Sequence, residues 1–320
     1  MNKADAVFEG GGVKGIGLVG ALTVAEEEGY KNWQRVAGTS AGAIAASLLA
    51  AGYSARDLRQ LMMELNYSEL LDYTSWWDIL AYPIGTVWGT LKDYGANDST
   101  PLEEWLEEKL TAKGVDTFAD LRSGSEKEKY RYRLRVIASD VSNRNMLVLP
   151  QEVERYGQDP DELSVAKAVG MSILFPGFFK PKKLNSSYVV DGGILSNFPV
   201  WLFDKSGVPD FPTFGFKLLE KERPITGPIR FAKEIFYTML EGHDNEHQED
   251  SNSVRTIGIP SLGVSPLAFN ITDEKKQRLF GQGTKAALEC VLMAADAGLD
   301  KAGKEVLSIA CTWRGQIHYC

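Results

Sequence analysis

Apolar residues recur along this chain in two patterns, short buried runs and longer stretches with helical spacing. Residues 4–12 (ADAVFEGGG) predict a short buried strand that leads into glycines, and residues 13–29 carry apolar side chains at helical spacing up to a closing glycine. Residues 33–40 (WQRVAGTS) predict a second strand, and residues 41–52 predict a buried helix. This strand–helix–strand–helix order predicts an α/β fold with parallel strands.

The rest of the chain continues in the same way. Further helical patterns cover residues 57–71, 99–114, 159–176, 228–241 and 273–298, and strand patterns cover residues 130–140, 146–150, 187–193, 213–219 and 254–259. Residues 130–140 alternate between polar and apolar positions, and together with residues 146–150 they predict a hairpin. No internal repeat or low-complexity tract interrupts the pattern, so we expect a single domain over residues 1–320.

Composition narrows the class of protein. A hydrophobic content of 44% with 24% charged residues is ordinary for a globular protein, and the net charge of −8 argues against nucleic acid as a partner. No apolar run is long enough to span a bilayer, and the first residues lack the apolar region of a signal peptide. Cys290, Cys311 and Cys320 show neither metal-ligand nor disulfide spacing. We therefore expect a cytoplasmic protein with free thiols.

A candidate nucleophile lies at the end of the second predicted strand. Residues 38–42 (GTSAG) match the G-x-S-x-G nucleophile elbow, in which a strand turns sharply into a helix and presents the serine hydroxyl. The serine is Ser40. A serine hydroxyl needs a base to become a useful nucleophile at neutral pH, so a partner must be found elsewhere in the chain.

The glycines after the first predicted strand suggest an oxyanion hole. Gly10, Gly12 and Gly15 formally match a dinucleotide fingerprint, but the elbow occupies the place where an acidic residue would hold the ribose. Consecutive glycines let backbone N–H groups approach a ligand, and a helix N-terminus favours negative charge. If the first two strands are parallel neighbours, this loop lies beside Ser40.

Histidine is a poor candidate for the base. His318 lies two residues from the end of the sequence. His243 and His247 lie in HDNEH, which spells the H-x-x-E-H zinc motif, but Gly242 and the polar residues around it favour an exposed loop. Zinc-dependent hydrolysis at His243 and His247 stays as the weakest alternative, and we expect no metal.

A carboxylate is the better candidate for the base. Asp191 ends an apolar strand and is followed by Gly192 and Gly193. Its ordinary pKa is near 3.9, but a desolvated pocket raises the pKa of a carboxyl group toward a useful value. Asp140, at the end of another strand, is interpreted as a turn residue that orders its loop, and it is left out of the site.

Three motifs in this order, GGGVKG (10–15), GTSAG (38–42) and DGG (191–193), resemble those of the patatin-like phospholipase family. Residues 138–143 (ASDVSN) and 172–181 (SILFPGFFKP) look like further segments of that family, so the resemblance covers nearly the whole chain. It implies a three-layer α/β/α fold with a mainly parallel central sheet. It also implies hydrolysis of lipid acyl esters by a Ser–Asp dyad, with no metal or cofactor.

Carried over residue by residue, the resemblance gives Ser40 as nucleophile, Asp191 as base, and Gly11 and Gly12 as oxyanion donors. Lys14 stands at a position that is often basic in the family, where it either steadies the loop or meets a phosphate. The other motif positions are Gly10, Val13, Gly15, Gly38, Thr39, Ala41, Gly42, Gly192 and Gly193.

The expected function is therefore that of a serine acyl hydrolase, a phospholipase A or lipid acyl esterase, acting on phospholipid or another acyl ester. The alternative of another class is a lipid-responsive effector or binding protein whose hydrolysis is gated or incidental. Residues 72–91 concentrate Trp76, Trp77, Tyr82 and Trp88. Such aromatics either form a mobile cap that makes peripheral contact with a membrane, or pack into the core or the acyl pocket.

Overall fold

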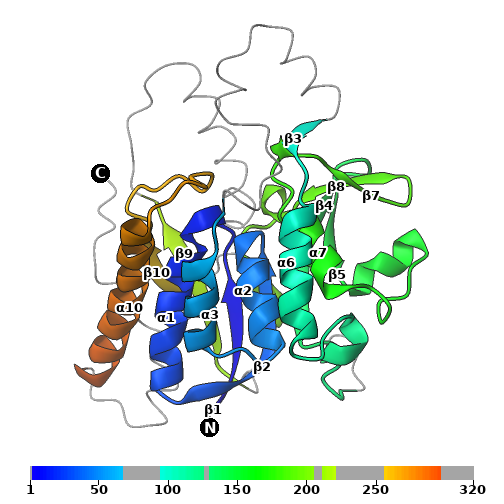
Figure 1. Ribbon diagram of the computed structural model, residues 1–320. Coiled ribbons are helices and arrows are strands. Elements are labelled where there is room, and N and C mark those ends of the chain that lie inside the picture. The colour runs from blue at the N-terminus through cyan, green and yellow to red at the C-terminus, as the bar shows by residue number, and fades with distance from the viewer. Residues whose placement is uncertain (1, 68–93, 126–129, 205–210, 221–255, 297–320) are drawn as a thin grey trace, which may run out of the picture.

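The computed structural model (Figure 1) describes residues 2–67, 94–125, 130–204, 211–220 and 256–296. Its centre is an eight-stranded sheet in which five neighbouring strands are parallel. In spatial order these strands are β10 (Thr256–Pro260), β9 (Thr213–Leu219), β1 (Asn2–Phe8), β2 (Tyr30–Thr39) and β4 (Leu134–Asp140). The antiparallel strands are β5 (Asn145–Leu149), β7 (Lys182–Leu184) and β8 (Ser187–Asp191). The predicted α/β fold with a mainly parallel sheet is confirmed.

Helices cover one face of this sheet (Figure 1). They are α1 (Gly15–Glu27), α2 (Ala41–Ala50), α3 (Ala55–Glu64), α6 (Thr100–Thr111), α7 (Val165–Ser172) and α10 (Asp273–Asp296), with α3 and α6 packed on the other helices. The other face is covered by apolar side chains around the 3₁₀ turn η6 (Val200–Phe203), which pack on Val7, Ala37 and Ile137. In the part of the chain that the structure describes, no helix is both long and apolar enough to cross a membrane.

Helix α1 is buried on nearly all sides because α10 and α3 pack over it. The α1–α10 contact depends on glycine. A Cβ at Gly20 would lie 2.1 Å from the Phe280 carbonyl oxygen, and a Cβ at Gly283 would lie 1.9 Å from the Gly17 carbonyl oxygen. The two backbones therefore approach more closely than any larger side chains would allow.

Some of the predicted boundaries were wrong. Residues 12–14 form a 3₁₀ turn (η1, Gly12–Lys14) before α1 begins. The predicted helix over 159–176 is only α7, because its N-cap is Ser164, whose side chain accepts the Lys167 N–H. The strand predicted over 130–140 begins only at Leu134, and all seven of its residues are buried because helices cover one face of β4 and the residues around η6 cover the other. The predicted hairpin with β5 is confirmed. The patterns at 72–91 and 228–241 lie outside the described residues.

The pairing of β4 brings two strand ends together. Residues 136–140 of β4 pair with β5, so β2 and β8 both lie on the opposite edge of β4. On that edge Thr39 of β2 pairs with Ile137, and Asp191 of β8 pairs with the next residue, Ala138. Because β2 and β8 run in opposite directions, their carboxyl ends meet.

Candidate active site

Ser40 occupies the sharp turn between β2 and α2. Its backbone lies at φ 53° and ψ −126°, a conformation that costs free energy for any residue except glycine. The glycines around it are required by contact: a Cβ at Gly38 would lie 2.3 Å from the Gly42 carbonyl oxygen, and a Cβ at Gly42 would lie 2.3 Å from the Phe8 carbonyl oxygen. The G-x-S-x-G pattern at residues 38–42 is therefore a packing requirement of the strained turn.

A buried serine holds this turn in place. The Ser40 backbone N–H donates to Ser172 Oγ at 2.9 Å, and the Ser172 hydroxyl donates to the Ile137 carbonyl oxygen at 2.5 Å. Ser172 is the last residue of α7 and is fully buried. Its side chain thus ties the elbow to strand β4.

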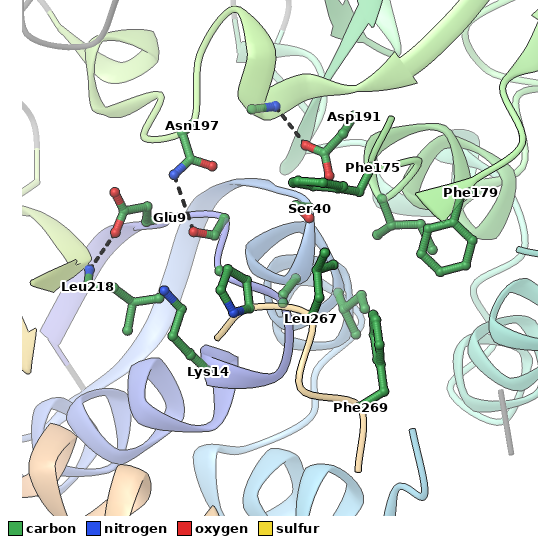
Figure 2. Close-up of a pocket in the computed structure, with 18 of the residues that line it drawn as sticks. Glu9, Lys14, Ser40, Phe175, Phe179, Asp191, Asn197, Leu218, Leu267 and Phe269 are labelled. Atoms are coloured by element: carbon green, nitrogen blue, oxygen red, sulfur yellow. Dashed lines mark hydrogen bonds between the residues drawn. The ribbon is translucent and has the colours of Figure 1, made fainter. Parts of the chain in front are cut away.

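Asp191 lies beside Ser40 because of the strand register described above. In Figure 2 its carboxylate points toward Ser40, and its Oδ1 accepts the Gly193 N–H at 2.7 Å. Burial raises the pKa of Asp191 to about 6, although hydrogen bonds from the Gly193 N–H and the Ser40 side chain act in the opposite direction. The sequence prediction that a buried carboxyl group would meet Ser40 agrees with this geometry.

The glycine loop after β1 lies on the other side of Ser40. Its ends are fixed, since the Gly10 N–H donates to the Asn197 carbonyl oxygen at 3.0 Å and the Val13 N–H to the Pro266 carbonyl oxygen at 3.1 Å. Between them, the N–H groups of Gly11 and Gly12 have no hydrogen-bond partner among the described residues. Gly12 has φ 55°, and a Cβ there would lie 2.0 Å from the Pro266 carbonyl oxygen. Only glycine fits at that position.

These groups line one pocket of about 120 Å³ (Figure 2). Its polar end holds Ser40, Asp191 and the glycine loop. The rest of its wall is mostly apolar and comes from several separate segments of the chain, with Glu9, Lys14, Asn197 and Glu220 at its edge. The apolar residues include Ile44, Met62, Leu102, Ile173, Phe175, Pro176, Phe179, Leu218, Leu267 and Phe269.

Lys14 is buried at the edge of this pocket and forms an ion pair with Glu220. The other carboxylate oxygen of Glu220 accepts the Ser261 hydroxyl at 2.9 Å. Lys14 therefore connects the start of α1 to residues that follow β9 and β10. Of the two roles that the sequence left open for Lys14, this contact fits the steadying of the loop.

The remaining candidates lie elsewhere. Asp140 accepts the N–H groups of Ser142 and Asn143 and the Tyr156 hydroxyl, so its interpretation as a turn residue is confirmed. Among the described residues, no group of three or more His, Cys, Asp or Glu side chains is placed to hold a metal ion. His243 and His247 lie outside the described residues, and zinc at that motif stays an untested hypothesis.

Sequence reasoning missed Ser172 and Asn197. Ser172 stands in the segment SILFPGFFKP, but no local pattern indicates that its hydroxyl binds the elbow. The Asn197 carbonyl oxygen and side chain both contact Gly10, with Asn197 Nδ2 3.3 Å from the Gly10 carbonyl oxygen. Such long-range contacts have no signature in a single sequence.

Comparison with known proteins identifies the family. The model of the patatin-like phospholipase family matches residues 6–204, which include Ser40 and Asp191. The "uncharacterized protein YqhO" of Bacillus subtilis is 40% identical over 291 residues, which are 88% of this chain and 95% of that protein. The "probable lipid hydrolase 463L" of Invertebrate iridescent virus 6 is 24% identical over 196 residues, 61% of each chain.

A solved structure shows the same fold. VipD from Legionella pneumophila matches with a TM-score of 0.52 at 19% identity, over 90% of this chain and 66% of the VipD chain. This chain thus spans less than two thirds of the length of VipD and of 463L. Since the family match covers more than half of the sequence, the chain belongs to the patatin-like phospholipase family, whose members hydrolyse ester bonds in lipids.

Proposed function

We propose that the chain is a serine acyl hydrolase of lipid esters in which Ser40 is the nucleophile and Asp191 the base. The observation that carries the proposal is the meeting of Ser40, Asp191 and two backbone N–H groups without a partner among the described residues, all at the polar end of one largely apolar pocket. A nucleophile, a base and oxyanion donors within one site are the parts that acyl transfer requires.

Asp191 is suited to act as the base without a histidine. A carboxyl group with an ordinary pKa is too weak a base at neutral pH to take a proton from serine. Burial raises the pKa of Asp191 to about 6, so at pH 7 the group is mostly ionised and yet more basic than a solvated carboxylate. The Gly193 N–H holds one oxygen, which leaves the other for the Ser40 hydroxyl.

The N–H groups of Gly11 and Gly12 are the proposed oxyanion donors. They lie at the start of α1, where the helix dipole also favours negative charge. The Ser40 N–H is already committed to Ser172, so it is not a free donor for the oxyanion. Loss of one oxyanion donor typically costs about 10² to 10³ in kcat.

The reaction follows from these positions. Asp191 takes the Ser40 proton as Oγ attacks the ester carbonyl carbon, and the Gly11 and Gly12 N–H groups stabilise the tetrahedral oxyanion. The C–O bond to the leaving alcohol breaks, the alcohol receives the proton from Asp191, and an acyl-Ser40 ester remains. Water, activated by Asp191, then attacks this ester, the fatty acid leaves, and the proton returns to Ser40.

The apolar wall supports a lipid acyl chain as the group that enters the pocket. Aromatic and aliphatic side chains such as Phe175, Phe179 and Leu267 surround the space beside Ser40. Burial of a methylene group against such a wall contributes about 0.8 kcal/mol, which favours long-chain over short-chain esters. The relative 463L is named a probable lipid hydrolase, which is consistent with this substrate class.

The proposal is tested by product analysis. Phosphatidylcholine with two different acyl chains is incubated with wild-type and Ser40→Ala protein, and the released fatty acids and lysolipids are measured by mass spectrometry. We expect fatty acid and lysolipid from the wild type alone. Products from both proteins would refute the role of Ser40, and lipid binding without any products would favour the effector alternative.

A further inference from the structure

Exposed apolar side chains gather at the end of the molecule where Ser40 lies. Among the described residues, six large hydrophobic side chains are classed as exposed. Four of these, Tyr94, Val141, Leu219 and Leu262, lie at the carboxyl edge of the sheet, the edge where the parallel strands end. The other two are on α10. Surface apolar residues scattered singly need no explanation, but a grouping around one site does.

The pairing of the strands explains why Tyr94 and Val141 project at this edge. Strand β4 continues for three residues beyond Ile137, which is level with the end of β2, and Val141 follows in the hairpin turn. Val141 pairs through its N–H with the Tyr188 carbonyl oxygen. The Tyr188 ring contacts that of Tyr94, with centroids 5.6 Å apart. Figure 1 shows β3 (Gly95–Asn97), β7 and β8 together at this end.

Leu219 and Leu262 lie across the pocket from these residues. Leu219 ends β9 directly after Leu218, which lines the pocket, and the Ser261 N–H donates to the Leu219 carbonyl oxygen. Leu262 has φ 53°, a conformation that is rare and unfavourable for leucine. The Leu262 side chain is 42% exposed, so burial offsets only part of the cost of this turn. Strained residues of this kind cluster at functional sites.

The same edge carries basic residues although the whole chain has a net charge of −8. Residues 141–145 and 180–188 contain one arginine and three lysines and no acidic residue. Lys182 is paired with Glu103, whereas Arg144, Lys180 and Lys183 are exposed. Lys180 directly follows Phe179 of the pocket wall, and Lys183 Nζ lies 5.1 Å from the centre of the Tyr188 ring.

Nearby acidic groups cancel only part of this charge. Hydrogen bonds from Thr100, together with the charges of Lys182 and Lys180, lower the pKa of Asp98, so this carboxylate stays ionised beside Lys180. Glu220 is paired with Lys14, and Arg144 and Lys183 form no ion pair among the described residues. Exposed cations beside exposed aromatic and aliphatic side chains, all around one apolar pocket, match the interface of a bilayer that contains anionic lipid.

We propose that this rim surface, formed by Tyr94, Val141, Leu219 and Leu262 with the cations Arg144, Lys180 and Lys183, docks the chain on an anionic lipid bilayer. The proposal rests on the proposed lipid hydrolase function. In this orientation the mouth of the pocket faces the bilayer, and an acyl ester reaches Ser40 without crossing bulk water. The cations meet the lipid phosphates and the apolar side chains enter the headgroup region.

The contribution of the basic residues is tested by measuring vesicle binding in the absence of hydrolysis. All proteins carry Ser40→Ala, so the vesicles are not consumed, and sedimentation is measured with phosphatidylcholine vesicles with or without roughly one third phosphatidylglycerol. Lys180→Glu/Lys183→Glu is compared with Lys31→Glu/Lys167→Glu, which makes the same charge change at exposed lysines at the opposite end. Since each basic residue near an anionic surface contributes about 1 kcal/mol, we expect the rim variant to lose at least about tenfold in affinity.

The contribution of the apolar side chains is tested by the same vesicle sedimentation with Tyr94→Ser/Leu262→Ser. Leu288→Ser/Leu292→Ser on α10 is the matched control. We expect only the rim variant to lose affinity for the vesicles. The proposal is overturned if rim and control variants bind the vesicles alike. It is also overturned if the parent protein binds neutral and anionic vesicles equally well, or binds neither kind.

The same substitutions in an otherwise wild-type chain should leave hydrolysis of a soluble ester within about twofold, because these side chains lie outside the pocket lining. A loss of soluble-ester hydrolysis in the rim variants would show that they damage the site, and would overturn a purely docking role. If the wild type binds anionic vesicles but hydrolyses neither lipid nor soluble ester, the docking surface stands and the proposed function fails.

Discussion

The Ser40 N–H donates a 2.9 Å hydrogen bond to Ser172 Oγ, and the Ser172 hydroxyl in turn donates to the Ile137 carbonyl oxygen. This relay joins the strained elbow to β4, the strand that also pairs with Asp191. The relative position of nucleophile and base therefore depends on this buried hydroxyl group as well as on the strand register. Ser40 would not adopt the strained backbone conformation of this turn without such contacts.

Ser172→Ala should lower kcat by about 10- to 100-fold and leave KM nearly unchanged, because a small misplacement of the nucleophile weakens the transition state more than substrate binding. Ser47→Ala is the matched control, since Ser47 is an equally buried serine in α2 whose hydroxyl bonds only the Ile44 carbonyl oxygen. Ser172→Cys keeps the side-chain volume with a weaker hydrogen bond, and it should recover stability more than kcat. Equal losses of kcat in Ser172→Ala and Ser47→Ala would mean that Ser172 only packs.

Asp191 sets the pH dependence of activity. With its pKa raised to about 6, kcat/KM should rise with pH and reach half its maximum near pH 6. An exposed catalytic carboxylate would instead place this midpoint at about pH 4. Initial rates on a soluble ester between pH 4 and 8 measure the midpoint, and a flat profile would count against Asp191 as the base.

The same shift makes Asp191 costly for stability. Its folded-state pKa lies above the ordinary aspartate value of 3.8, so the folded state binds the proton more tightly and loses stability as pH rises from about 4 to 6. Asp191→Asn should therefore stabilise the fold above pH 6, on the order of 2 to 3 kcal/mol, and leave it unchanged near pH 3.5. Denaturant unfolding of both proteins at pH 8 and at pH 3.5 measures the difference in their free energies of unfolding. Equal stability of the two proteins at pH 8 would show that burial does not perturb this carboxyl group.

Gly12→Ala should abolish activity, because a Cβ would lie 2.0 Å from the Pro266 carbonyl oxygen at φ 55° and would displace the oxyanion loop. Gly52→Ala is the control, with φ 94° and no atom within 4 Å of the added Cβ. It carries the backbone strain of about 1 kcal/mol without any contact to the site. A Gly12→Ala protein that keeps more than about a tenth of the wild-type kcat would contradict the placement of the oxyanion donors.

Hydrolysis should not depend on a metal ion. We expect full activity after strong chelation, and near wild-type kinetics for His243→Ala/His247→Ala, because the proposed chemistry uses only Ser40, Asp191 and backbone N–H groups. Metal analysis of the purified protein accompanies the assay. Stoichiometric zinc that is lost together with activity in the double variant would restore the zinc alternative.

The sequence predicts most of the site because the site is built from local patterns. The elbow at 38–42 and the glycines at 10–12 form recognisable local motifs, although most of the clashes that require glycine there involve distant residues such as Phe8 and Pro266. The parallel order of β1 and β2 follows from the strand–helix–strand pattern. Even the boundaries of α2 are indicated, since its apolar run ends at a glycine.

What the sequence does not predict are contacts that the sheet creates over long distances. The end-to-end meeting of β2 and β8 depends on which edge of β4 each strand occupies, and two antiparallel partners of β4 have no pattern that orders them. The hydroxyl of Ser172 and the Lys14–Glu220 pair join residues more than one hundred positions apart. The alternation over 130–140 predicts the strand and the hairpin, but not the burial of β4 on both faces, because that burial is a property of its neighbours.

The central claim is that Asp191 activates Ser40, and the rate of covalent labelling by a fluorophosphonate, followed by intact mass and peptide mapping, tests it most directly. The account predicts one adduct per chain, located on Ser40. The labelling rate should fall as the pH drops below about 6, and it should be at least about 100-fold lower in Asp191→Asn than in the wild type. Labelling of another residue, or labelling of Ser40 at an undiminished rate in Asp191→Asn, would contradict it.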